Sequence, residues 1–220
     1  MIPSDSIPVE NEHVAETRQQ LLVAAGEVFA EYGFRDATVR EICRRAGANI
    51  AAVNYHFGDK ETLYTEVLSY AHEISLKKHP LLPGVAADSL PEVRLQAFVH
   101  SLLSRILDTD PGSWHGQLMA REMVEPSEAL DILVDQRIRP MAGALSQIIA
   151  PILGLPEGDE RVRLCAFSVV SQCVFYKHCR PVVCRLYPEL QLQDPKYIAK
   201  LARHITQFSL TAMKQLPPEA

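Results

Sequence analysis

The sequence lacks the features that would place it in a membrane or a secreted class. No apolar run within its 220 residues approaches the roughly 20 residues that a membrane-spanning helix requires. Met1–Glu16 is polar and acidic, without the basic start and apolar centre of a signal peptide, so we expect none. The five cysteines form an odd number, which favours reduced thiols over a disulfide framework. We therefore expect a cytoplasmic protein that does not bind membranes.

Enzyme and cofactor motifs are absent as well. The sequence contains no glycine-rich phosphate loop, no HExxH and no GxSxG, so it predicts neither an enzyme nor a cofactor. One alternative is an enzyme on a helical scaffold that uses His115, Glu122 or Cys179, and its weakness is the lack of any motif. Turnover of a substrate would distinguish this alternative from a binding protein.

The cysteines near the C-terminal end do not have the spacing of a metal site. Cys173, Cys179 and Cys184 gather around His178, but no CxxC or zinc-finger spacing is present. We predict no metal site and expect buried, inert thiols. A regulator switched by oxidation of Cys173 is the alternative, and it would release its partner on treatment with peroxide or diamide.

Proline is missing from a long N-terminal stretch. Fifteen prolines occur in the chain, but none lies in Val9–His79, which permits several uninterrupted helices there. Within that stretch, residues 35–60 carry four Arg and one Lys against three acidic residues, whereas residues 1–34 carry one Arg against six. The chain as a whole has a net charge of −5, but the local field decides how a protein docks on phosphate. The 35–60 window is thus the candidate nucleic-acid face.

Apolar residues recur at steps of three and four along the chain, and no alternating strand of five or more residues stands out. The pattern predicts an all-α fold of about nine helices. A capping box of Thr17 and Gln20 predicts the start of the first helix, and Gly33 its end. The further expected helices follow Thr38, Asn49, Asp59 and Ser89, span Trp114–Glu125, follow Ser127 with a kink at Pro140, and span Glu160–His178 and Pro195–Leu216.

The second and third of these helices are short and are joined by Gly47-Ala48-Asn49, which predicts a helix-turn-helix. The apolar residues of both helices would pack on the first helix, which leaves the other face of the third helix free to enter a major groove. That face carries an amide, small apolar groups and ring donors, which suit adenine, thymine methyl and phosphate. Its residues are Ile50, Ala51, Ala52, Asn54, Tyr55 and His56.

These residues stand in a longer pattern that is recognisable. The stretches TRQQLLVAAGEVFAEYGFRDATVREICRRAGA and VNYHFGDKETLY, within Thr17–Leu68, resemble the DNA-binding domain of the TetR/AcrR family of transcriptional regulators. Farther along, Arg121-Glu122-Met123 with Pro126-Ser127, then Arg139-Pro140, resemble the C-terminal domain of the CecR-type subgroup. The resemblance implies control of exporter or drug-sensitivity genes.

The resemblance also implies roles for single residues. Arg40 matches a position that reaches a base edge, and Thr38 and Lys60 match phosphate-binding positions at helix N-termini. Asn54 departs from the Tyr of many members, which leaves it a base reader or a spacer, and Ile50 either meets a thymine methyl or packs on the first helix. Arg44 is expected near phosphate and Arg45 in solvent. The expected DNA-contacting residues are Thr38, Arg40, Asn49, Ile50, Ala51, Asn54, Tyr55, His56 and Lys60.

We therefore expect a homodimeric repressor that binds a palindromic double-stranded operator and releases it on binding a small-molecule effector. Residues 1–60 would bind DNA, 61–79 would connect, and 80–220 would bind the effector and dimerise. Arg121 and Glu122 are either ligand-orienting groups or an ion pair between helices. The candidate pocket residues are Phe98, Trp114, Met119, Arg121, Glu122, Phe175 and Tyr176, and the candidate dimer residues are Phe167, Val170, Val174, Leu201, Ile205 and Phe208.

Overall fold

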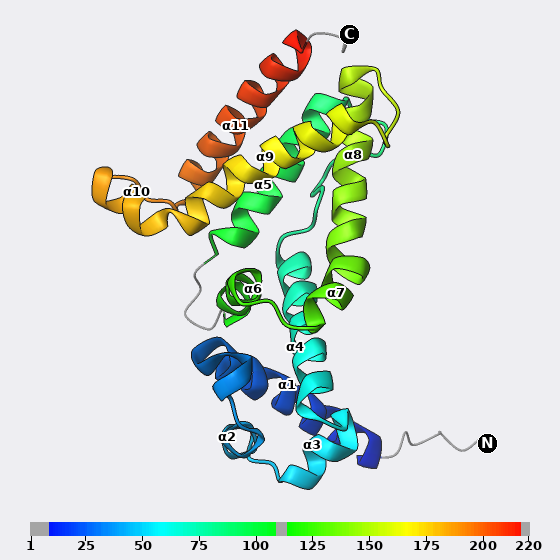
Figure 1. Cartoon of the computed structure of the whole chain (residues 1–220), viewed down its shortest axis with the longest axis vertical. Coiled ribbons are helices and arrows are strands. Elements are labelled where there is room, and N and C mark those ends of the chain that lie inside the picture. The colour runs from blue at the N-terminus through cyan, green and yellow to red at the C-terminus, as the bar shows by residue number, and fades with distance from the viewer. Residues whose placement is uncertain (1–8, 109–113, 217–220) are drawn as a thin grey trace, which may run out of the picture. The chain divides into compact units, whose positions relative to one another are not determined.

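The computed structural model describes residues 9–108 and 114–216, and within them it is helical with no strand, which confirms the all-α prediction. None of the described helices is long and apolar enough to cross a membrane. The helices are α1 (Val9–Asp36), α2 (Val39–Ala46), α3 (Ile50–Phe57), α4 (Lys60–Lys78), α5 (Pro91–Ile106), α6 (Trp114–Val124), α7 (Ala129–Leu133), the π-helical η1 (Val134–Ile138), α8 (Arg139–Leu153), α9 (Glu160–His178), α10 (Arg180–Leu186) and α11 (Pro195–Gln215) (Figure 1).

Most of the predicted helix starts are confirmed by side-chain caps. Asn49 Oδ1 accepts a hydrogen bond from the Ala52 N–H at 2.9 Å, and Asp59 Oδ1 accepts one from the Thr62 N–H at 2.7 Å. Asp194 likewise accepts from the Lys196 N–H, which starts α11 at Pro195. These caps satisfy backbone donors that have no partner within their own helix.

Two local predictions are wrong, and one helix was not predicted. Thr17 does not begin α1, because the helix starts at Val9 and carries Thr17 in its interior. Ser89 does not cap α5, whose N-cap is Leu90 without a side-chain hydrogen bond. The helix α10 was not expected at all. A capping motif is a local pattern, and nothing in it prevents a helix from continuing through it.

The proline at 140 has a different consequence from the predicted kink. It occupies the first turn of α8, where its missing N–H is of no cost. The turn before it, η1, is a π-helix, so the change of helix geometry falls just before the proline and not at it.

The chain divides into two compact units that do not follow the order of the sequence. Unit 1 comprises Met1–Glu73 and Trp114–Leu133, and unit 2 comprises Ile74–Ser113 and Val134–Ala220. The helices α6 and α7 therefore pack with the N-terminal helices, although the sequence grouped them with the C-terminal domain. The long helix α4 contributes its first part to unit 1 and its last turn to unit 2.

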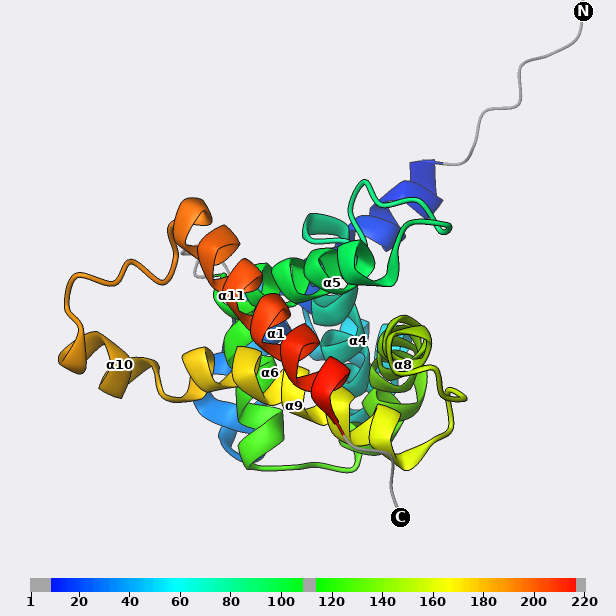
Figure 2. The ribbon, with the colours of Figure 1, turned by 90° about the horizontal axis from the view of Figure 1, so that it is seen from above.

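Unit 2 is built on α5, α8, α9 and α11, whose apolar faces form one core (Figure 2). Figure 2 shows α11 lying across α5 and α9, and the contacts between these helices agree. The buried members of this core include Leu95, Phe98, Leu145, Val162, Val169, Cys173, Leu201 and Ile205.

Two of the predicted dimer residues belong to this core. Leu201 and Ile205 on α11 are buried against their own unit, so they are not on a surface that a second copy could reach. Apolar residues lie on two sides of α11. The spacing in the sequence had assigned the residues of both sides to one apolar face. Phe208, which lies on the other side, is 61% exposed.

Candidate nucleic-acid interface

The α2–turn–α3 segment is held in place by its own caps. Thr38 Oγ1 accepts a hydrogen bond from the Glu41 N–H at 3.2 Å, which starts α2. Gly47 ends α2 in the left-handed region at φ 64°, where a residue with a Cβ is disfavoured. Asn49 then starts α3 two residues later. The reversal of the chain is thus encoded by three residues.

The inward face of the segment is buried on α1 and α4. Ile42 and Cys43 of α2 and Val53 and Phe57 of α3 belong to the core of unit 1, together with apolar residues of α1 and α4 such as Phe29. Burial of Val53 and Phe57 fixes the rotation of α3 about its axis. The opposite face of α3 is consequently the one presented to solvent.

The outward face of α3 carries the predicted reading residues. Tyr55 is 76% exposed and Ile50 is 53% exposed, and Ala51 and Asn54 are exposed beside them. Ile50 therefore does not pack on the first helix, which leaves its side chain free to contact a base. His56 is half-buried, with its ring 5.0 Å from that of Tyr55.

Three predicted contact residues are engaged within the unit. The Asn49 side chain serves as the N-cap of α3, and Thr38 Oγ1 serves as the N-cap of α2. Lys60 Nζ donates a hydrogen bond to the Arg35 carbonyl oxygen at 3.2 Å and lies 4.8 Å from the centre of the Phe34 ring. The Lys60 charge thus stays at the N-terminus of α4, near the surface that carries α3.

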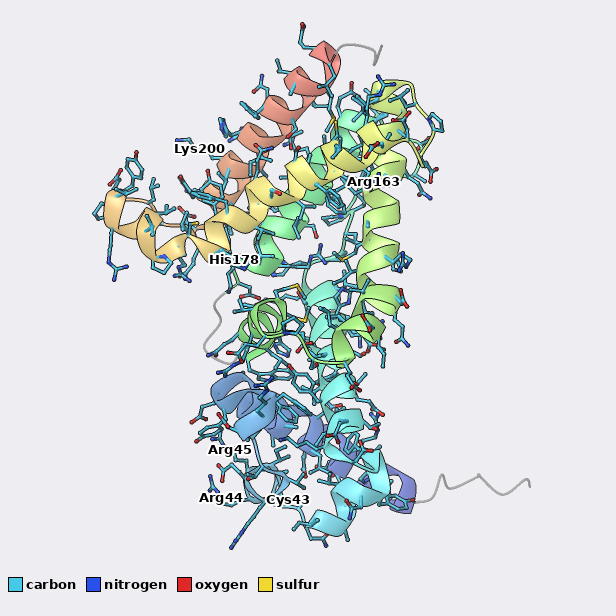
Figure 3. All side chains as sticks on the ribbon, in the orientation of Figure 1. Cys43, Arg44, Arg45, Arg163, His178 and Lys200 are labelled. Carbon is cyan, nitrogen blue, oxygen red and sulfur yellow. The ribbon has the colours of Figure 1, made fainter. Side chains whose placement is uncertain are left out.

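The arginines of α2 differ in their surroundings. Arg44 clasps the Glu41 carboxylate with two bonds, from Nε at 2.8 Å and from Nη2 at 2.7 Å. Arg45 donates to Glu41 at 2.9 Å and to Glu31 at 2.6 Å, so the expectation that it is solvated is wrong. Arg40 is exposed and makes no ion pair with any described residue. Figure 3 shows Arg44 and Arg45 on α2.

These ion pairs reduce the positive charge that α2 offers to phosphate. Hydrogen bonds from Arg44 and then from Arg45 lower the pKa of Glu41 to about 2, so the carboxylate is ionised at all ordinary pH values. Hydrogen bonds to Glu31 and then to Glu41 raise the pKa of Arg45. Of the three arginines of α2, Arg40 is the one whose charge is not offset by a neighbouring carboxylate.

The helix α6 is attached to α4 and α1 by the polar contacts of two neighbouring residues. Glu122 is fully buried and accepts hydrogen bonds from the Tyr64 hydroxyl at 2.6 Å and from the Ser127 N–H at 2.8 Å and hydroxyl at 2.9 Å. Burial, and then the bond to Glu122, raise the pKa of Tyr64. Arg121 Nη1 donates to the carbonyl oxygens of Ala30 and Glu31 at 3.3 and 3.2 Å. These carbonyls lie just before Gly33, where the backbone of α1 leaves helical geometry at φ 79° and ψ 170°. Arg121 and Glu122 thus bind different helices and do not pair with each other.

The start of α6 rests on a glycine of α1. A Cβ added at Gly26 would lie 2.4 Å from the Trp114 ring, so the close approach of the two helices requires glycine there. Trp114, Leu118 and Glu122 are buried on one face of α6 at steps of four. This stripe was present in the sequence, but a stripe does not say which helix it will pack against.

The predicted pocket residues are divided between the units. Trp114, Met119, Arg121 and Glu122 belong to unit 1, where the contacts above account for three of them. Phe98 is in the core of unit 2, and on α9 Phe175 is exposed and Tyr176 is half-buried. Neither unit by itself brings all seven residues together.

The cysteines give no support to a switch at Cys173. This residue is fully buried, and burial raises the pKa of its thiol to about 12, which disfavours the reactive thiolate. Within the described part of the chain, no three His, Cys, Asp or Glu side chains are placed to hold a metal ion.

Comparison with known proteins places both ends of the chain in one family. Residues 21–67 match the family model of bacterial regulatory proteins of the TetR family, and residues 91–213 match the C-terminal domain of the HTH-type transcriptional dual regulator CecR. The CecR regulator of Shigella flexneri is 27% identical over 172 residues, which cover 74% of this chain and 76% of that protein. The HTH-type transcriptional repressor NicS of Pseudomonas putida is 25% identical over 220 residues, covering 94% of this chain and 97% of the relative.

Solved structures agree at the level of the fold. The crystal structure of a bacterial regulatory protein in the TetR family from Rhodococcus has a TM-score of 0.64 and 24% identity, and the alignment covers 91% of this chain and 98% of that one. The TetR-family regulator PfmR from Thermus thermophilus has a TM-score of 0.61 at 18% identity, with 92% and 98% covered.

Proposed function

Because the chain belongs to the TetR family, carries a CecR-type C-terminal domain and is therefore a DNA-binding transcriptional regulator, we propose that it is a ligand-responsive repressor. It binds a palindromic operator as a homodimer in the cytoplasm and releases it when a small molecule binds. The observation that carries this proposal is the α3 surface, where Ile50, Ala51, Asn54 and Tyr55 are exposed while the opposite face is locked into a core.

We assign base recognition to residues whose polar or apolar side-chain ends are exposed to solvent. Arg40, Asn54 and Tyr55 supply a guanidinium, an amide and a phenol to base edges in the major groove. Thr38 and Lys60 position the protein on phosphate at the N-termini of α2 and α4, and His56 does so from the last turn of α3. Asn49 contributes to DNA binding indirectly, because its side chain caps α3 and so fixes the start of that helix.

Dimerisation falls to the exposed apolar residues of α9 and α11. Phe167 is 59% exposed on α9, with Leu164 and Phe175 exposed one and two turns away, and Val170 and Val174 half-buried. On α11, Phe208 borders a shallow groove of about 470 Å³ lined by His204, Gln207, Phe208, Thr211, Ala212 and Gln215. Large aromatic side chains in solvent mark an interaction surface. A second copy of the chain is the occupant, because two α3 helices related by a two-fold axis are needed to read a palindrome.

Release follows from coupling through α4. This helix is in the core of unit 1 through Leu63, Val67 and Leu68, and its last turn belongs to unit 2. A ligand that shifts the last turn of α4 acts on the same rigid element that positions α3. Release then requires that the ligand binds better to the form whose two α3 helices do not fit successive major grooves.

The names of two relatives support the sign of regulation. The P. putida relative is an HTH-type transcriptional repressor and the S. flexneri relative is an HTH-type transcriptional dual regulator, and we assign this chain the repression that the first name states. Exporter or drug-sensitivity genes are the proposed targets, as the CecR-type resemblance implies.

Footprinting on the DNA upstream of the protein's own gene tests the proposal. We expect protection of a palindrome with two half-sites on one face of the duplex. The Asn54→Ala variant should lose the footprint, and Arg163→Ala, on the surface of α9 (Figure 3), should retain it. Equal binding to every DNA fragment of the same length would contradict the proposal.

A further inference from the structure

A charged side chain is buried in unit 2 with almost no partner. Arg105, in the last turn of α5, is 9% exposed. Its Nη1 donates to the thioether sulfur of Met141 on α8 at 3.1 Å. Its Nε and Nη2 are buried and have no hydrogen-bond partner among the described residues. A thioether is a weak acceptor, so the guanidinium keeps nearly all its hydrogen-bonding capacity unused.

The nearest acidic residue in the sequence does not compensate this charge. Asp108 follows three residues later, but its carboxylate binds Lys78 Nζ at 2.7 Å and lies 3.6 Å from His79 Nε2. Burial lowers the pKa of Arg105 to about 10, which still leaves the guanidinium protonated at neutral pH. A buried, uncompensated charge is costly, and proteins keep such groups where a partner arrives from outside.

The two unused nitrogen atoms lie on one edge of the guanidinium. The same edge of Arg44 clasps a carboxylate in this protein, with Nε and Nη2 bonded to the two oxygens of Glu41. A fork of this kind matches the two oxygens of a carboxylate better than any neutral group. The unused edge of Arg105 therefore has the geometry of a carboxylate receptor.

Apolar core residues of α5 and α8 lie within two turns of Arg105 and Met141. Phe98 and Leu102 precede Arg105 by two turns and one turn on α5, and Leu145 follows Met141 by one turn on α8, so each shares a face with a member of the Arg105–Met141 pair. All three belong to the buried core of unit 2, in which α5 and α8 are in contact (Figure 2). A ligand that reaches Arg105 between these helices meets the guanidinium together with apolar core side chains of α5 and α8.

We propose that Arg105 anchors the effector, and that the effector is a small carboxylate with an apolar body. The inference rests on the proposed ligand-responsive function and names the ligand class for it. The carboxylate binds the Nε and Nη2 edge of Arg105, and the apolar part packs on the α5 and α8 side chains. Binding compensates the buried charge, which is the source of its stabilising effect.

The test measures thermal unfolding of the full chain with hexanoate, octanoate and benzoate, each against its matched amide. We expect at least one carboxylate to raise the Tm of the wild type while its amide does not. The Arg105→Met variant should lose on the order of tenfold or more in affinity for that carboxylate. Arg163→Met, a matched change at an exposed arginine of α9 (Figure 3), should bind as the wild type does.

Three outcomes overturn the proposal. One is that no carboxylate of the series stabilises the wild type, or that Arg105→Met responds equally. Another is that inorganic phosphate stabilises the wild type as strongly as the best carboxylate, which indicates a general anion site. The third concerns Asp110, which lies outside the described residues. Arg105→Met should raise the Tm of the ligand-free protein, because it removes a buried charge that has no counter-charge. If Arg105→Met and Asp110→Asn instead lower the Tm by equal amounts, Asp110 is the counter-charge of Arg105 and the chain itself supplies it.

A DNA assay separates this proposal from the proposed function. The wild type and Arg105→Met should produce the same footprint without ligand, and the effective carboxylate should remove only the wild-type footprint. If the wild type binds the carboxylate but no operator, the repressor proposal fails and the receptor proposal survives. If it binds the operator but no carboxylate, the reverse holds.

Discussion

Glu122 in unit 1 and Arg105 in unit 2 are both buried, and the two units satisfy their hydrogen-bonding groups in opposite ways. In unit 1, Glu122 accepts hydrogen bonds from the Tyr64 hydroxyl and from two donors of Ser127. In unit 2, Arg105 has one bond, to a thioether. A satisfied buried group joins helices and has no capacity left, whereas an unsatisfied one is a candidate for binding a partner. The difference indicates that Glu122 is structural and that Arg105 is functional.

A new charge in the core of unit 2 should have the largest effect. We expect Ile205→Glu to destabilise the fold by ~4 kcal/mol or more, because the carboxylate would be buried in the apolar core without a donor. Ile205→Val should cost only about 0.5–1.5 kcal/mol. Chemical denaturation followed by circular dichroism measures both. A folded Ile205→Glu protein of wild-type stability would show that this core tolerates charge and would weaken the argument on Arg105.

The same charge on the other side of α11 should leave the fold intact. Phe208→Glu should give a folded monomer with wild-type helicity that no longer binds the operator, because Phe208 is exposed in the chain and would be buried only in the proposed dimer. Sedimentation at several concentrations measures the association state. A Phe208→Glu protein that remains dimeric would place the interface elsewhere.

Removal of a donor from Glu122 should have an intermediate effect. We expect Tyr64→Phe to cost about 1–3 kcal/mol of unfolding free energy, because it deletes a 2.6 Å hydrogen bond to a buried carboxyl. Tyr70→Phe, farther along α4, is the control, since the Tyr70 hydroxyl is bonded to Gln19 at an exposed site. If both variants lose the same small amount, the Glu122 network is not the main attachment of α6 to α4.

Substitutions of Arg40 on α2 and Lys60 on α4 should separate base reading from phosphate binding. Arg40→Ala should cost ~1–3 kcal/mol on the operator and relax the preference at one base pair per half-site. Lys60→Ala should weaken all sequences alike and flatten the salt dependence. Binding curves on single-base operator variants distinguish the two patterns. If Arg40→Ala loses operator and random DNA equally, Arg40 contacts phosphate only.

Release of the paired arginines should have the smallest effect. Glu41→Gln frees Arg44 and Arg45 from their carboxylate, so affinity for random duplex should rise about two- to fivefold and its salt dependence should steepen. Acid should not reproduce this change above pH 4, because the depressed pKa of Glu41 keeps it charged until the pH falls towards about 2. Fluorescence anisotropy with random duplex at several salt concentrations measures the effect. An unchanged affinity would show that Glu41 does not restrain the two arginines.

Local sequence signals predicted the helix-turn-helix almost completely. The bounds of α3 and α9 agree with the prediction, and the caps at Thr38, Asn49 and Asp59 are present. Each depends on a bond between residues two to four apart, or on a glycine at positive φ, so neighbouring residues suffice to determine it.

The same local reasoning failed where the outcome depended on distant residues. The motif at Thr17 is a good cap in isolation, but the helix continues to Val9. The stripe on α11 was evident, but the division of Ile205 into the core and Phe208 into solvent depends on how α11 lies against α5 and α9.

The sequence by itself thus determined the all-α class, the first and last residues of α3 and the residues on the outer face of α3. Only the tertiary structure decided that α6 packs with the N-terminal helices, because an apolar stripe specifies burial but not the partner. It also decided which charges are compensated. Arg44 and Arg105 look alike in a sequence, and the contacts around each give one a carboxylate and the other a thioether.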